Sequence, residues 1–470
     1  MGSTASSAVS VRWEVEIGVT APAQITVPRR NAPLSAIEWA RDRVDRNRRG
    51  EPAGFFSVCS AHPWVLEAAI QQAIESDSYL CVESTSNQVN QFGGYTGDNP
   101  AEFAERLLEL ARSLGLAEHR LLLGGDHLGP YPWRHLANAT AMENGCQLVR
   151  ECILAGYSKI HLDASMRCAD DPPIISEEVV ARRAARLCQA AETACKEAGR
   201  NAAAVMYVIG TEVPTPGGEQ VDQSELRVSN VGAVRDTLEV TRKAFMEAGL
   251  EAGWERIIGL VVQPGVEFGD DTVRDYNREE ARALSQHLLT HPAIVYEAHS
   301  TDYQTSTNLR QMVEDHFAIL KVGPWLTFAM REAIFALSEI ERNWLGGRAG
   351  VQLSNVRGAL ESAMVGNPEH WQAYYSGQSA ELKFARRFSF SDRSRYYWLD
   401  PFVQCEVKQL FRNLSTAKIP LSVLSQFLPL QYERVRAGQL AADPGSLIHD
   451  SVRNVLRTYA ACAGQLPSQS

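Results

Sequence analysis

The chain lacks several features that would place it in a familiar functional class. No run of eighteen consecutive apolar residues occurs, so no segment is predicted to span a membrane. A GxxxxGKS or GxxxxGKT loop is absent, which argues against a P-loop kinase. No GxGxxG follows a predicted strand at the start of a βαβ unit, which argues against a Rossmann-type NAD site.

Paired cysteines and a secretory leader are also missing. The nine cysteines include no CxxC pair, and we expect buried thiols rather than disulfides. The first 30 residues contain no apolar core of the length that a signal peptide needs. Together these absences predict a protein of the reducing cytoplasm.

Basic residues are in the minority. Lysine and arginine number 46 against 56 aspartates and glutamates, which gives a net charge of −10 and a pI near 5.7. This balance argues against nucleic acid or an anionic membrane as the main partner. A locally basic pocket for a phosphate remains compatible with it.

The chain does contain eight short apolar runs, which are separated by segments of helical length. Parallel strands that are buried on both faces read as continuous apolar runs rather than alternating ones. Eight such strands, each followed by a helix, predict an α/β fold of the (β/α)8 TIM-barrel type. The runs cover residues 55–62, 79–85, 121–127, 159–165, 204–213, 257–265, 293–300 and 318–324.

The chain is also longer than one barrel requires. With 470 residues it exceeds a typical barrel by well over 100. We expect an N-terminal extension over residues 1–34, the barrel over 35–346 and a C-terminal α-helical module over 347–470. The last boundary follows two glycines, beyond which helical patterns continue but Val/Ile-rich runs stop.

The ends of the predicted strands carry residues that suit a metal ion. A GGDH motif ends the third run and places Asp126 and His127 at the barrel mouth, where the active sites of such barrels lie. His299 ends the seventh run, Glu212 the fifth and Gln263 the sixth. Two imidazoles with carboxylate and amide oxygens suit Zn²⁺, and also Mn²⁺, Co²⁺ or Ni²⁺. The sequence leaves open which of Glu212 and Gln263 contacts the metal.

Two further strands offer groups for proton transfer and charge stabilisation. In IHLDAS, His161 and Asp163 lie two residues apart, on one face of the fourth strand. Asp163 is nearer the mouth and is a candidate acid or base beside Asp126, whereas His161 is more typical of a buried hydrogen-bonding residue. Lys321, near the end of the eighth run, could neutralise an oxyanion or form a Schiff base, and a metal site favours the electrostatic role.

Polar segments near the mouth supply candidates for substrate binding. The loop SNQVNQFGGYTG after the second run is rich in amides and glycine, which suits sugar hydroxyls or a lid. SDRSRYYW in the C-terminal module holds two arginines, whose forked donors suit a phosphate. A structural turn and surface ion pairs are the alternatives for these two motifs. The candidate substrate-binding residues are Ser60, His62, Glu83, Asn87, Gln88, Ser300, Asp302, Arg393 and Arg395.

Ten long motifs are spread over roughly residues 35–460. They are SVCSAHPWVLEAAI (57–70), ESTSNQVNQFGGYTG (83–97), LLGGDHLGP (122–130), GYSKIHLDASMRCADDP (156–172), YVIGTEVPTPGGE (207–219), VVQPGVEF (261–268), YEAHSTDYQT (296–305), HFAILKVGPWLTFAMREAIFAL (316–337), FSFSDRSRYYW (388–398) and IPLSVLSQFLP (419–429). Together they resemble the family of the Z-type accessory, or non-catalytic, subunit of class II D-tagatose-1,6-bisphosphate aldolase. Some members of that family look like D-tagatose 6-phosphate 4-epimerases, and the group was once labelled tagatose-6-phosphate kinase.

The order of the motifs also resembles the metal-dependent barrel of class II aldolases. In that barrel an Asp-His pair on the third strand supplies a proton carrier and a metal ligand, which implies these roles for Asp126 and His127. Histidines on the sixth and seventh strands complete the metal site there. His299 matches the second of them, whereas Gln263 stands in place of the first, and Glu212 is the candidate substitute.

The chemistry of a ketohexose narrows the function that this resemblance implies. Carbon 4 is β to the carbonyl, so its hydrogen is not acidic and simple proton abstraction cannot invert it. Transient oxidation by NAD lacks its motif here. Retro-aldol cleavage between carbons 3 and 4, with re-addition to the other face of the aldehyde, needs a divalent metal as Lewis acid and a proton carrier, Asp126 or Asp163. We therefore expect a metal-dependent carbon-4 epimerase of ketohexoses or their 6-phosphates, which interconverts D-tagatose 6-phosphate and D-fructose 6-phosphate.

The leading alternative is a non-catalytic subunit that stabilises a separate class II D-tagatose-1,6-bisphosphate aldolase. The expected cofactor is a divalent metal, with Zn²⁺ preferred. The expected partners are a small ketose or ketose phosphate, further copies of this chain, and a class II aldolase catalytic subunit. Neither nucleic acid nor a membrane is expected as a partner.

Overall fold

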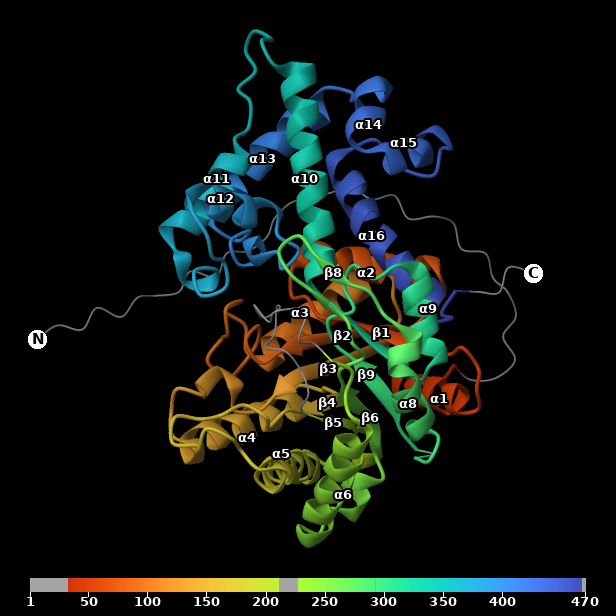
Figure 1. Ribbon diagram of the computed structural model, residues 1–470. Coiled ribbons are helices and arrows are strands. Elements are labelled where there is room, and N and C mark those ends of the chain that lie inside the picture. The colour runs from red at the N-terminus through yellow and green to blue at the C-terminus, as the bar shows by residue number, and fades with distance from the viewer. Residues whose placement is uncertain (1–32, 211–226, 292, 467–470) are drawn as a thin grey trace, which may run out of the picture. The chain divides into compact units, whose positions relative to one another are not determined.

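A closed parallel barrel forms the centre of the protein. The computed structural model describes residues 33–210, 227–291 and 293–466, and Ser35–Ser470 forms one compact unit. All eight predicted strands are present, and they pair in the order β1-β10-β9-β6-β5-β4-β3-β2 (Figure 1). The TIM-barrel prediction is therefore confirmed.

The described strands and helices alternate as the apolar runs predict. The barrel strands are β1 (Phe55–Val58), β2 (Leu80–Thr85), β3 (Leu121–Leu128), β4 (Lys159–Leu162), β5 (Met206–Ile209), β6 (Ile257–Val262), β9 (Val295–Ala298) and β10 (Ile319–Val322). The helices that follow them are α2 (Pro63–Glu75), α3 (Pro100–Leu114), α4 (Asn138–Leu154), α5 (Glu177–Glu197), α6 (Val231–Glu247), α8 (Arg278–Leu288), α9 (Ser306–Glu314) and α10 (Pro324–Leu345). The apolar runs did not predict the short hairpin between β6 and α8, made of β7 (Glu267–Phe268) and β8 (Val273–Arg274).

Local sequence signals set the ends of the surrounding helices. In α3, the side chain of Asn99 accepts hydrogen bonds from the first turn, and Glu102 bonds back to the backbone of Asn99. Pro100 occupies the first helical position, where its missing N–H costs nothing. Gly115 ends the helix with φ of 91°, a conformation that favours glycine.

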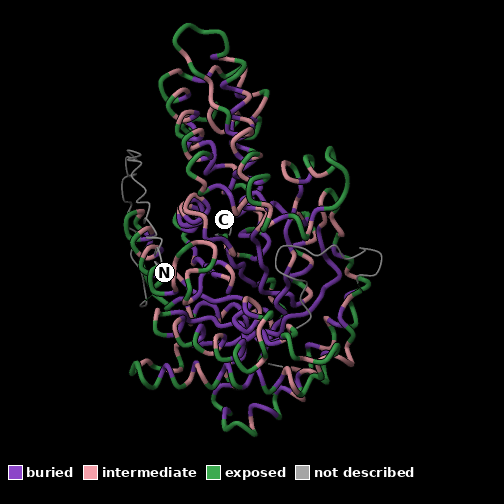
Figure 2. Tube along the Cα trace, turned by 90° about the vertical axis from the view of Figure 1, so that its left-hand side faces the viewer, coloured by how far each residue is buried: buried purple, intermediate pink, exposed green. Residues whose placement is uncertain are grey.

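The N-terminal end of the barrel is filled by apolar side chains. Phe55, Leu122, Met206 and Ile258 point inward and pack in one cluster with Trp39 of α1 (Ala36–Arg48). The Cα trace of Figure 2 shows the buried residues concentrated in the barrel. Because α1 closes this end, small molecules can reach the barrel interior only from the C-terminal ends of the strands, where active sites of this fold lie.

The C-terminal part of the chain is helical, as predicted. It contains α11 (Val356–Gly366), α12 (Ser379–Phe388), α13 (Pro401–Thr416), α14 (Leu421–Phe427), α15 (Pro429–Arg436) and α16 (Pro444–Cys462). The long helix α16 packs against α2, α9 and α10, and α13 and α14 also contact α10. These helices thus belong to the same compact unit as the barrel, and the proposed boundary after residue 346 remains a prediction.

A buried ion pair joins the C-terminal helices to the barrel. The Nε of Arg331 in α10 lies 2.8 Å from Oδ1 of Asp392, and the two side chains are 2% and 0% exposed. Thr327 donates a further bond of 2.6 Å to Asp392 Oδ2. Asp392 directly precedes η5 (Arg393–Tyr396), so this contact fixes the segment that carries the two predicted phosphate-binding arginines.

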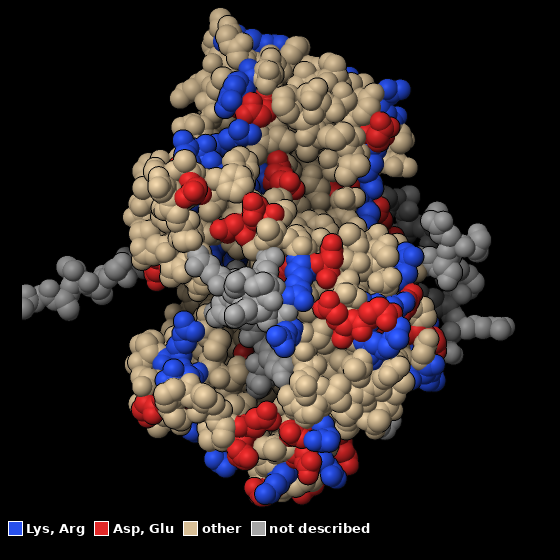
Figure 3. Space-filling view, viewed as in Figure 1, with Lys and Arg blue, Asp and Glu red and all other residues tan. Residues whose placement is uncertain are grey.

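The surface carries charges of both signs. Figure 3 shows lysine and arginine interspersed with aspartate and glutamate over the visible face, without a large patch of one sign. Within the described ranges, no helix has the length and apolarity needed to cross a membrane.

Replacing Asp392 by alanine tests the role of this ion pair. The change leaves the Arg331 guanidinium buried without its carboxylate, so we expect the free energy of unfolding to fall by about 3–5 kcal/mol. The matched control is Asp236→Ala, since Asp236 pairs with Arg235 at a side-chain exposure of 56% and should change stability by about 0.5 kcal/mol or less. Urea unfolding followed by circular dichroism measures both, and equal effects would show that the buried pair is dispensable.

Candidate active site and metal centre

A layer of charged side chains lies inside the barrel, above the apolar cluster. Lys159 Nζ contacts Glu83 and lies 2.7 Å from Oε2 of Glu297, and all three residues are 0% exposed. Lys321 contacts Glu83 as well, and its Nζ lies 3.5 Å from Glu297 Oε1 and 3.1 Å from Asp126 Oδ1. Two lysines and two glutamates from β2, β4, β9 and β10 thus form one buried network beneath the barrel mouth.

The strand register explains how this network can form. Gly124 of β3 pairs with Glu83 on one side and with Lys159 on the other. A Cβ atom at Gly124 would lie only 2.9 Å from Cγ of Glu83. The glycine therefore leaves the space in which the glutamate and the lysine meet across the intervening strand.

The end of β3 turns two successive side chains toward the cavity. Neighbouring residues of a regular strand point to opposite faces. Here the pairing of β3 with β4 shifts register between Gly125 and Leu128, and His127 has φ of 50°. This strained conformation is uncommon for a residue with a side chain, and it is typical of functional sites. As a result, both Asp126 and His127 line the cavity at the mouth.

Three histidines gather at this point. The ring centroids of His127 and His299 are 4.9 Å apart, those of His127 and His161 5.2 Å, and those of His161 and His299 5.5 Å. Imidazoles bound to one tetrahedral zinc ion have centroids about 5 Å apart, given Zn–N bonds of about 2.1 Å. The three rings are therefore spaced as a shared metal ion requires.

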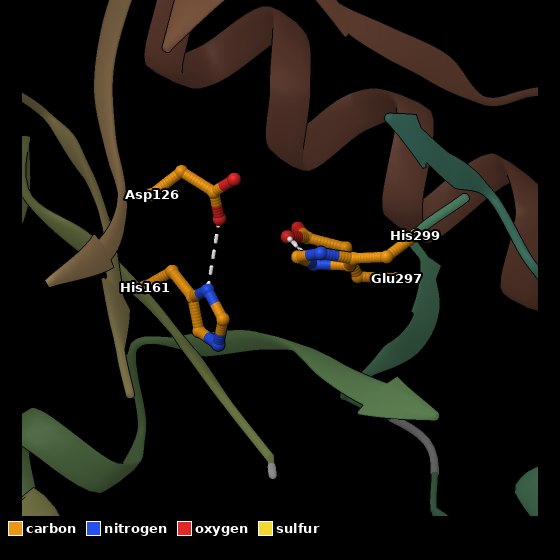
Figure 4. Close-up of side chains that lie close together, drawn as sticks. All are labelled: Asp126, His161, Glu297 and His299. Atoms are coloured by element: carbon orange, nitrogen blue, oxygen red, sulfur yellow. Dashed lines mark hydrogen bonds and ion pairs between the residues drawn. The ribbon is translucent and has the colours of Figure 1, made fainter. Parts of the chain in front are cut away.

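A carboxylate contacts each of these rings. His127 Nδ1 lies 2.8 Å from Asp163 Oδ2. His161 Nδ1 lies 2.9 Å from Asp126 Oδ1, and His299 Nε2 lies 3.2 Å from Glu297 Oε1 (Figure 4). An imidazole that donates one N–H to a carboxylate presents the other nitrogen as a metal ligand. His161 Nδ1 also lies 3.2 Å from the backbone N–H of His127, so its tautomer is not fixed by Asp126 alone. The other nitrogen of His161, Nε2, is buried and has no hydrogen-bond partner among the described residues.

The cluster carries more negative than positive charge. Four carboxylates, those of Glu83, Asp126, Asp163 and Glu297, face the ammonium groups of Lys159 and Lys321, so two negative charges remain when the imidazoles are neutral. A divalent cation would balance this surplus, which is costly to bury without compensation.

The same excess of negative charge shifts the pKa values of His127 and Asp126. Burial lowers the pKa of His127, but the carboxylates of Asp126 and Asp163 outweigh burial and raise it to about 9. Burial alone would raise the pKa of Asp126, yet the neighbouring histidines hold it well below its usual range. A proton on His127 and a bound metal ion would both reduce the excess negative charge of the cluster. Metal binding therefore releases such protons.

The donor set therefore fits a divalent metal. Asp126, His161, Glu297 and His299 each offer one ligand atom, and these atoms lie within 4.8 Å of one another (Figure 4). His127 contributes a fifth potential donor beside them. Imidazole nitrogens with carboxylate oxygens suit Zn²⁺, Mn²⁺, Co²⁺ or Ni²⁺.

A cavity opens directly above the cluster. Its volume of about 130 Å³ has room for about ten water molecules, which is the scale of a small polar substrate. Besides the metal cluster it is lined by groups that can hydrogen-bond to hydroxyls and anions, among them Tyr95 from the β2 loop and Tyr396 from η5. The barrel and the C-terminal helices thus share this cavity.

The structure brings together most of the residues that the sequence nominates. The predicted residues that line the cavity are Ser60, His62, Asn87, Gln88, Asp126, His127, His299, Ser300, Asp302, Lys321 and Arg395. His62 caps α2 by accepting the Trp64 N–H at Nδ1, and burial lowers its pKa to about 3. Its neutral ring therefore carries the proton on Nε2.

Three other nominated residues lie outside the cavity lining, each for a visible reason. Gln263 turns its Oε1 to the backbone N–H groups of Gly265 and Val266, so it caps its own turn and is outside the histidine cluster. Glu83 lies in the charged layer rather than in the cavity. Arg393 covers the ring of Tyr374 and donates to the His370 carbonyl. Glu212 lies outside the described residues.

Asp163, a fourth nominated residue outside the cavity lining, has both carboxylate oxygens engaged in hydrogen bonds. Its Oδ2 is bonded to His127, and its Oδ1 accepts hydrogen bonds from the backbone and the hydroxyl of Ser165 at 3.1 and 2.8 Å. With both oxygens engaged, its visible role is to orient His127.

Sequence reasoning missed three residues of the site. Glu297 and His161 belong to the candidate metal group, and Lys159 is central to the charged layer. Glu297 is separated by two residues from His299, so the period of a strand places both on the inward face. All three missed residues lie within runs that are otherwise apolar. A polar residue inside such a run was the available signal for a functional position, but the runs were interpreted as core strands.

Fold and site together define a (β/α)8-barrel protein with a candidate metal centre at its catalytic mouth. Residues 40–464 match the family model described as D-tagatose-1,6-bisphosphate aldolase subunit GatZ/KbaZ-like. The chain belongs to this family.

Solved structures give further likenesses. The crystal structure of a probable tagatose 6 phosphate kinase from Sinorhizobium meliloti 1021 shares 41% identity with a TM-score of 0.80, covering 87% of this chain and all of that one. The YdjI aldolase of Escherichia coli K12 shares 10% identity, with a TM-score of 0.40, over 82% of this chain and 99% of its own. Fructose-bisphosphate aldolase of Campylobacter jejuni shares 12%, with a TM-score of 0.43, over 82% and 96%.

The substitution Asp163→Asn distinguishes the orienting role from the predicted acid–base role. If Asp163 orients a metal-binding His127, the affinity for Zn²⁺ should fall about 10–100-fold, because an outer carboxylate is lost. Isothermal titration with Zn²⁺ measures this, with Asp236→Asn at the exposed pair as the matched control. Unchanged zinc affinity together with lost turnover would restore Asp163 as the acid or base.

Proposed function

We propose that this protein is a metal-dependent carbon-4 epimerase of ketohexose 6-phosphates, which interconverts D-tagatose 6-phosphate and D-fructose 6-phosphate. The observation that supports it most is the cluster of three histidines and four carboxylates at the floor of a cavity of substrate size. Buried, strained and incompletely paired groups of this kind are costly in a purely structural barrel.

The metal would be held by His161, His299 and Glu297 of the candidate group, with His127 beside them as a further donor, and Zn²⁺ is the preferred ion. When bound there, it would supply Lewis-acid stabilisation of negative charge on the substrate's carbonyl oxygen. Asp126 is the proton carrier, because it lines the cavity and its Oδ2 has no partner closer than His127 Nε2 at 3.7 Å. As an ionised carboxylate it would take the proton of the carbon-4 hydroxyl as the bond between carbons 3 and 4 breaks.

Lys321 fixes the position and charge of Asp126. Its ammonium lies 3.1 Å from Asp126 Oδ1 and is surrounded by carboxylates, which suits an electrostatic role and not a Schiff base. His62, with its proton on Nε2, is a donor for a substrate oxygen at the opposite wall. Gln88 is held by the Cys59 carbonyl and the Thr85 N–H, so it shapes the same wall.

The C-terminal helices supply the candidate phosphate subsite. Arg395 lines the cavity, and backbone carbonyls and the Tyr396 hydroxyl, 2.9 Å away, hold its guanidinium. Burial would raise the pKa of Tyr396, but the charges of Arg395 and Arg393 lower it. The electrostatic potential is therefore positive at the side of the cavity that η5 forms. A 6-phosphate directed to Arg395 would leave the carbonyl end of the ketose for the metal cluster.

The family description names a D-tagatose-1,6-bisphosphate aldolase subunit, which is compatible with a second candidate function, a non-catalytic subunit of a class II aldolase. This alternative predicts no turnover by the chain alone and stable co-purification with a catalytic subunit. A kinase activity, as in the name of the Sinorhizobium meliloti relative, would require ATP binding, for which the sequence offers no nucleotide motif.

Carbon-13 NMR of the metal-loaded protein with D-tagatose 6-phosphate tests the epimerase directly. We expect D-fructose 6-phosphate to appear without a partner protein and to stop appearing after chelation. Asp126→Asn removes the carboxylate that contacts His161, so it is assayed with Zn²⁺ in saturating excess, where the metal stays bound. Its rate should fall by at least about 100-fold, whereas Glu178→Gln on the helix surface should have little effect. Absence of any conversion by the metal-loaded protein would favour the accessory subunit, and activity retained by Asp126→Asn would exclude this proton carrier.

A second test concerns the phosphate subsite. Arg395→Met should raise the KM for D-tagatose 6-phosphate about 10–100-fold, because a charged hydrogen bond is lost, and should change the constants for free D-tagatose little. Arg134→Met is the control, since Arg134 is exposed and does not line the cavity. Equal losses for the two sugars would show that Arg395 is structural.

A further inference from the structure

One carboxylic acid at the cavity has no role in the scheme above. Asp302 follows β9 in the turn that begins at His299, and it is 3% exposed. Its Oδ1 accepts both backbone N–H groups at the start of α10, from Gly323 at 3.0 Å and from Trp325 at 2.8 Å. Its Oδ2 has no hydrogen bond within the described ranges, and the residue lines the cavity.

The turn that carries Asp302 is held rigidly. Ser300 and Tyr303, on either side of it, have φ of 54° and 65°, which is strained for residues with side chains. The hydroxyl of Thr301 donates to the Lys321 carbonyl at 2.5 Å, and that of Tyr303 to the Phe390 carbonyl at 2.6 Å. Strain that the surroundings enforce in this way is typical of functional positions.

Asp302 and Asp126 reach the cavity from well-separated strand ends, because Asp302 is bonded to the start of α10 beyond β10, three strands from β3. In the closed strand order β9 is four places from β3, so the two strands face each other across the eight-stranded barrel. Asp126 ends β3 and Asp302 follows β9, and both line the one cavity. In the proposed scheme the carbon-4 hydroxyls of the two epimers lie on opposite sides, so each needs its own group to exchange a proton with. Asp163 is not available for this, because its oxygens are bonded to His127 and Ser165.

The surroundings of Asp302 suit proton donation near neutral pH. Burial raises the pKa of Asp302 to about 6, although the N–H groups of Trp325 and Gly323 and the charge of Arg395 act against the rise. The other titratable groups that interact with it are the phenols of Tyr303, in its own turn, and Tyr459, in α16. An acid in this range is close to the working optimum for proton transfer.

Taking the proposed epimerase as the basis, we infer that Asp302 is the second proton-transfer residue, which serves the carbon-4 oxygen of one epimer while Asp126 serves that of the other.

The proton and electron balance is simple. Asp126 takes the proton of the carbon-4 hydroxyl, the bond between carbons 3 and 4 breaks, and its electron pair passes to the three-carbon enediolate as carbon 4 becomes an aldehyde. The aldehyde turns over, carbon 3 attacks its other face, and the new carbon-4 alkoxide takes the proton of Asp302. Exchange with water then returns the proton from Asp126 to Asp302, and the reverse reaction uses the two groups in the opposite order.

The variant Asp302→Asn removes the acid and keeps an oxygen that can accept from Gly323 and Trp325. We expect it to fold, to retain its metal and to epimerise at least about 100-fold more slowly. Cleavage of each epimer can be measured separately, because hexacyanoferrate(III) oxidises the enediolate and is bleached. Asp302→Asn should lose cleavage of one epimer and keep that of the other, and Asp126→Asn should show the reciprocal pattern.

The outcomes separate this inference from the proposed function. No conversion by the wild-type protein overturns the epimerase and the inference with it. Conversion by the wild type together with full activity of Asp302→Asn, or with equal loss of both cleavage reactions, overturns the inference alone. If Asp302→Asn is found to melt well below the wild type, Asp302→Glu keeps the acid but shifts it, and should slow cleavage of the same single epimer. Asp236→Asn, at the exposed pair, is the matched control.

Discussion

The structure depends most on an excess of negative charge enclosed by the barrel strands. Four carboxylates and two lysines lie where the cores of such barrels are usually branched and apolar. Their mutual attraction must offset the cost of desolvating every one of them. Gly124 leaves the space in which these charged side chains meet. The apolar cluster closed by α1 shields them from water on one side. The negative charge that the lysines leave uncompensated can be neutralised by a proton or by a bound cation.

Backbone strain is concentrated where this charged layer meets the cavity. Three of the described non-glycine residues with positive φ, His127, Ser300 and Tyr303, surround the candidate metal centre and its neighbouring turn. Each such residue costs about 1–3 kcal/mol and persists only if its surroundings impose it. The Tyr459 hydroxyl forms a hydrogen bond with Thr301, and the Phe390 carbonyl accepts one from Tyr303. Segments that are remote in sequence therefore hold this turn in place.

The fold could be predicted from the sequence because strands buried on both faces leave an unbroken apolar trace. The mouth could be predicted for the same reason, since polar residues that follow such runs must meet at one end. The roles within the mouth could not. The sequence does not show which groups face the two oxygens of Asp163, on which the choice between an acid and an orienting role depends. Nor does it show that the side-chain oxygen of Gln263 accepts hydrogen bonds from its own turn. Glu297 was not nominated and His161 was assigned to the core, because a polar residue within an apolar run resembles a hydrogen-bonded interruption of the core.

The same network bears on whether the barrel is an enzyme or an inert partner. Replacing a buried ion pair by apolar side chains of similar volume is often neutral or stabilising, so selection for stability alone offers no reason to keep one. In this barrel Asp126, His127, His299 and Lys321 line one cavity, and the charged layer with the unpartnered Nε2 of His161 lies buried next to them. A scaffold that served only to stabilise another subunit would place its polar groups on the surface that meets that subunit. The concentration of buried charge and strain beside one cavity is the observation on which the proposed epimerase rests, and Arg395 brings the C-terminal helices to the same cavity.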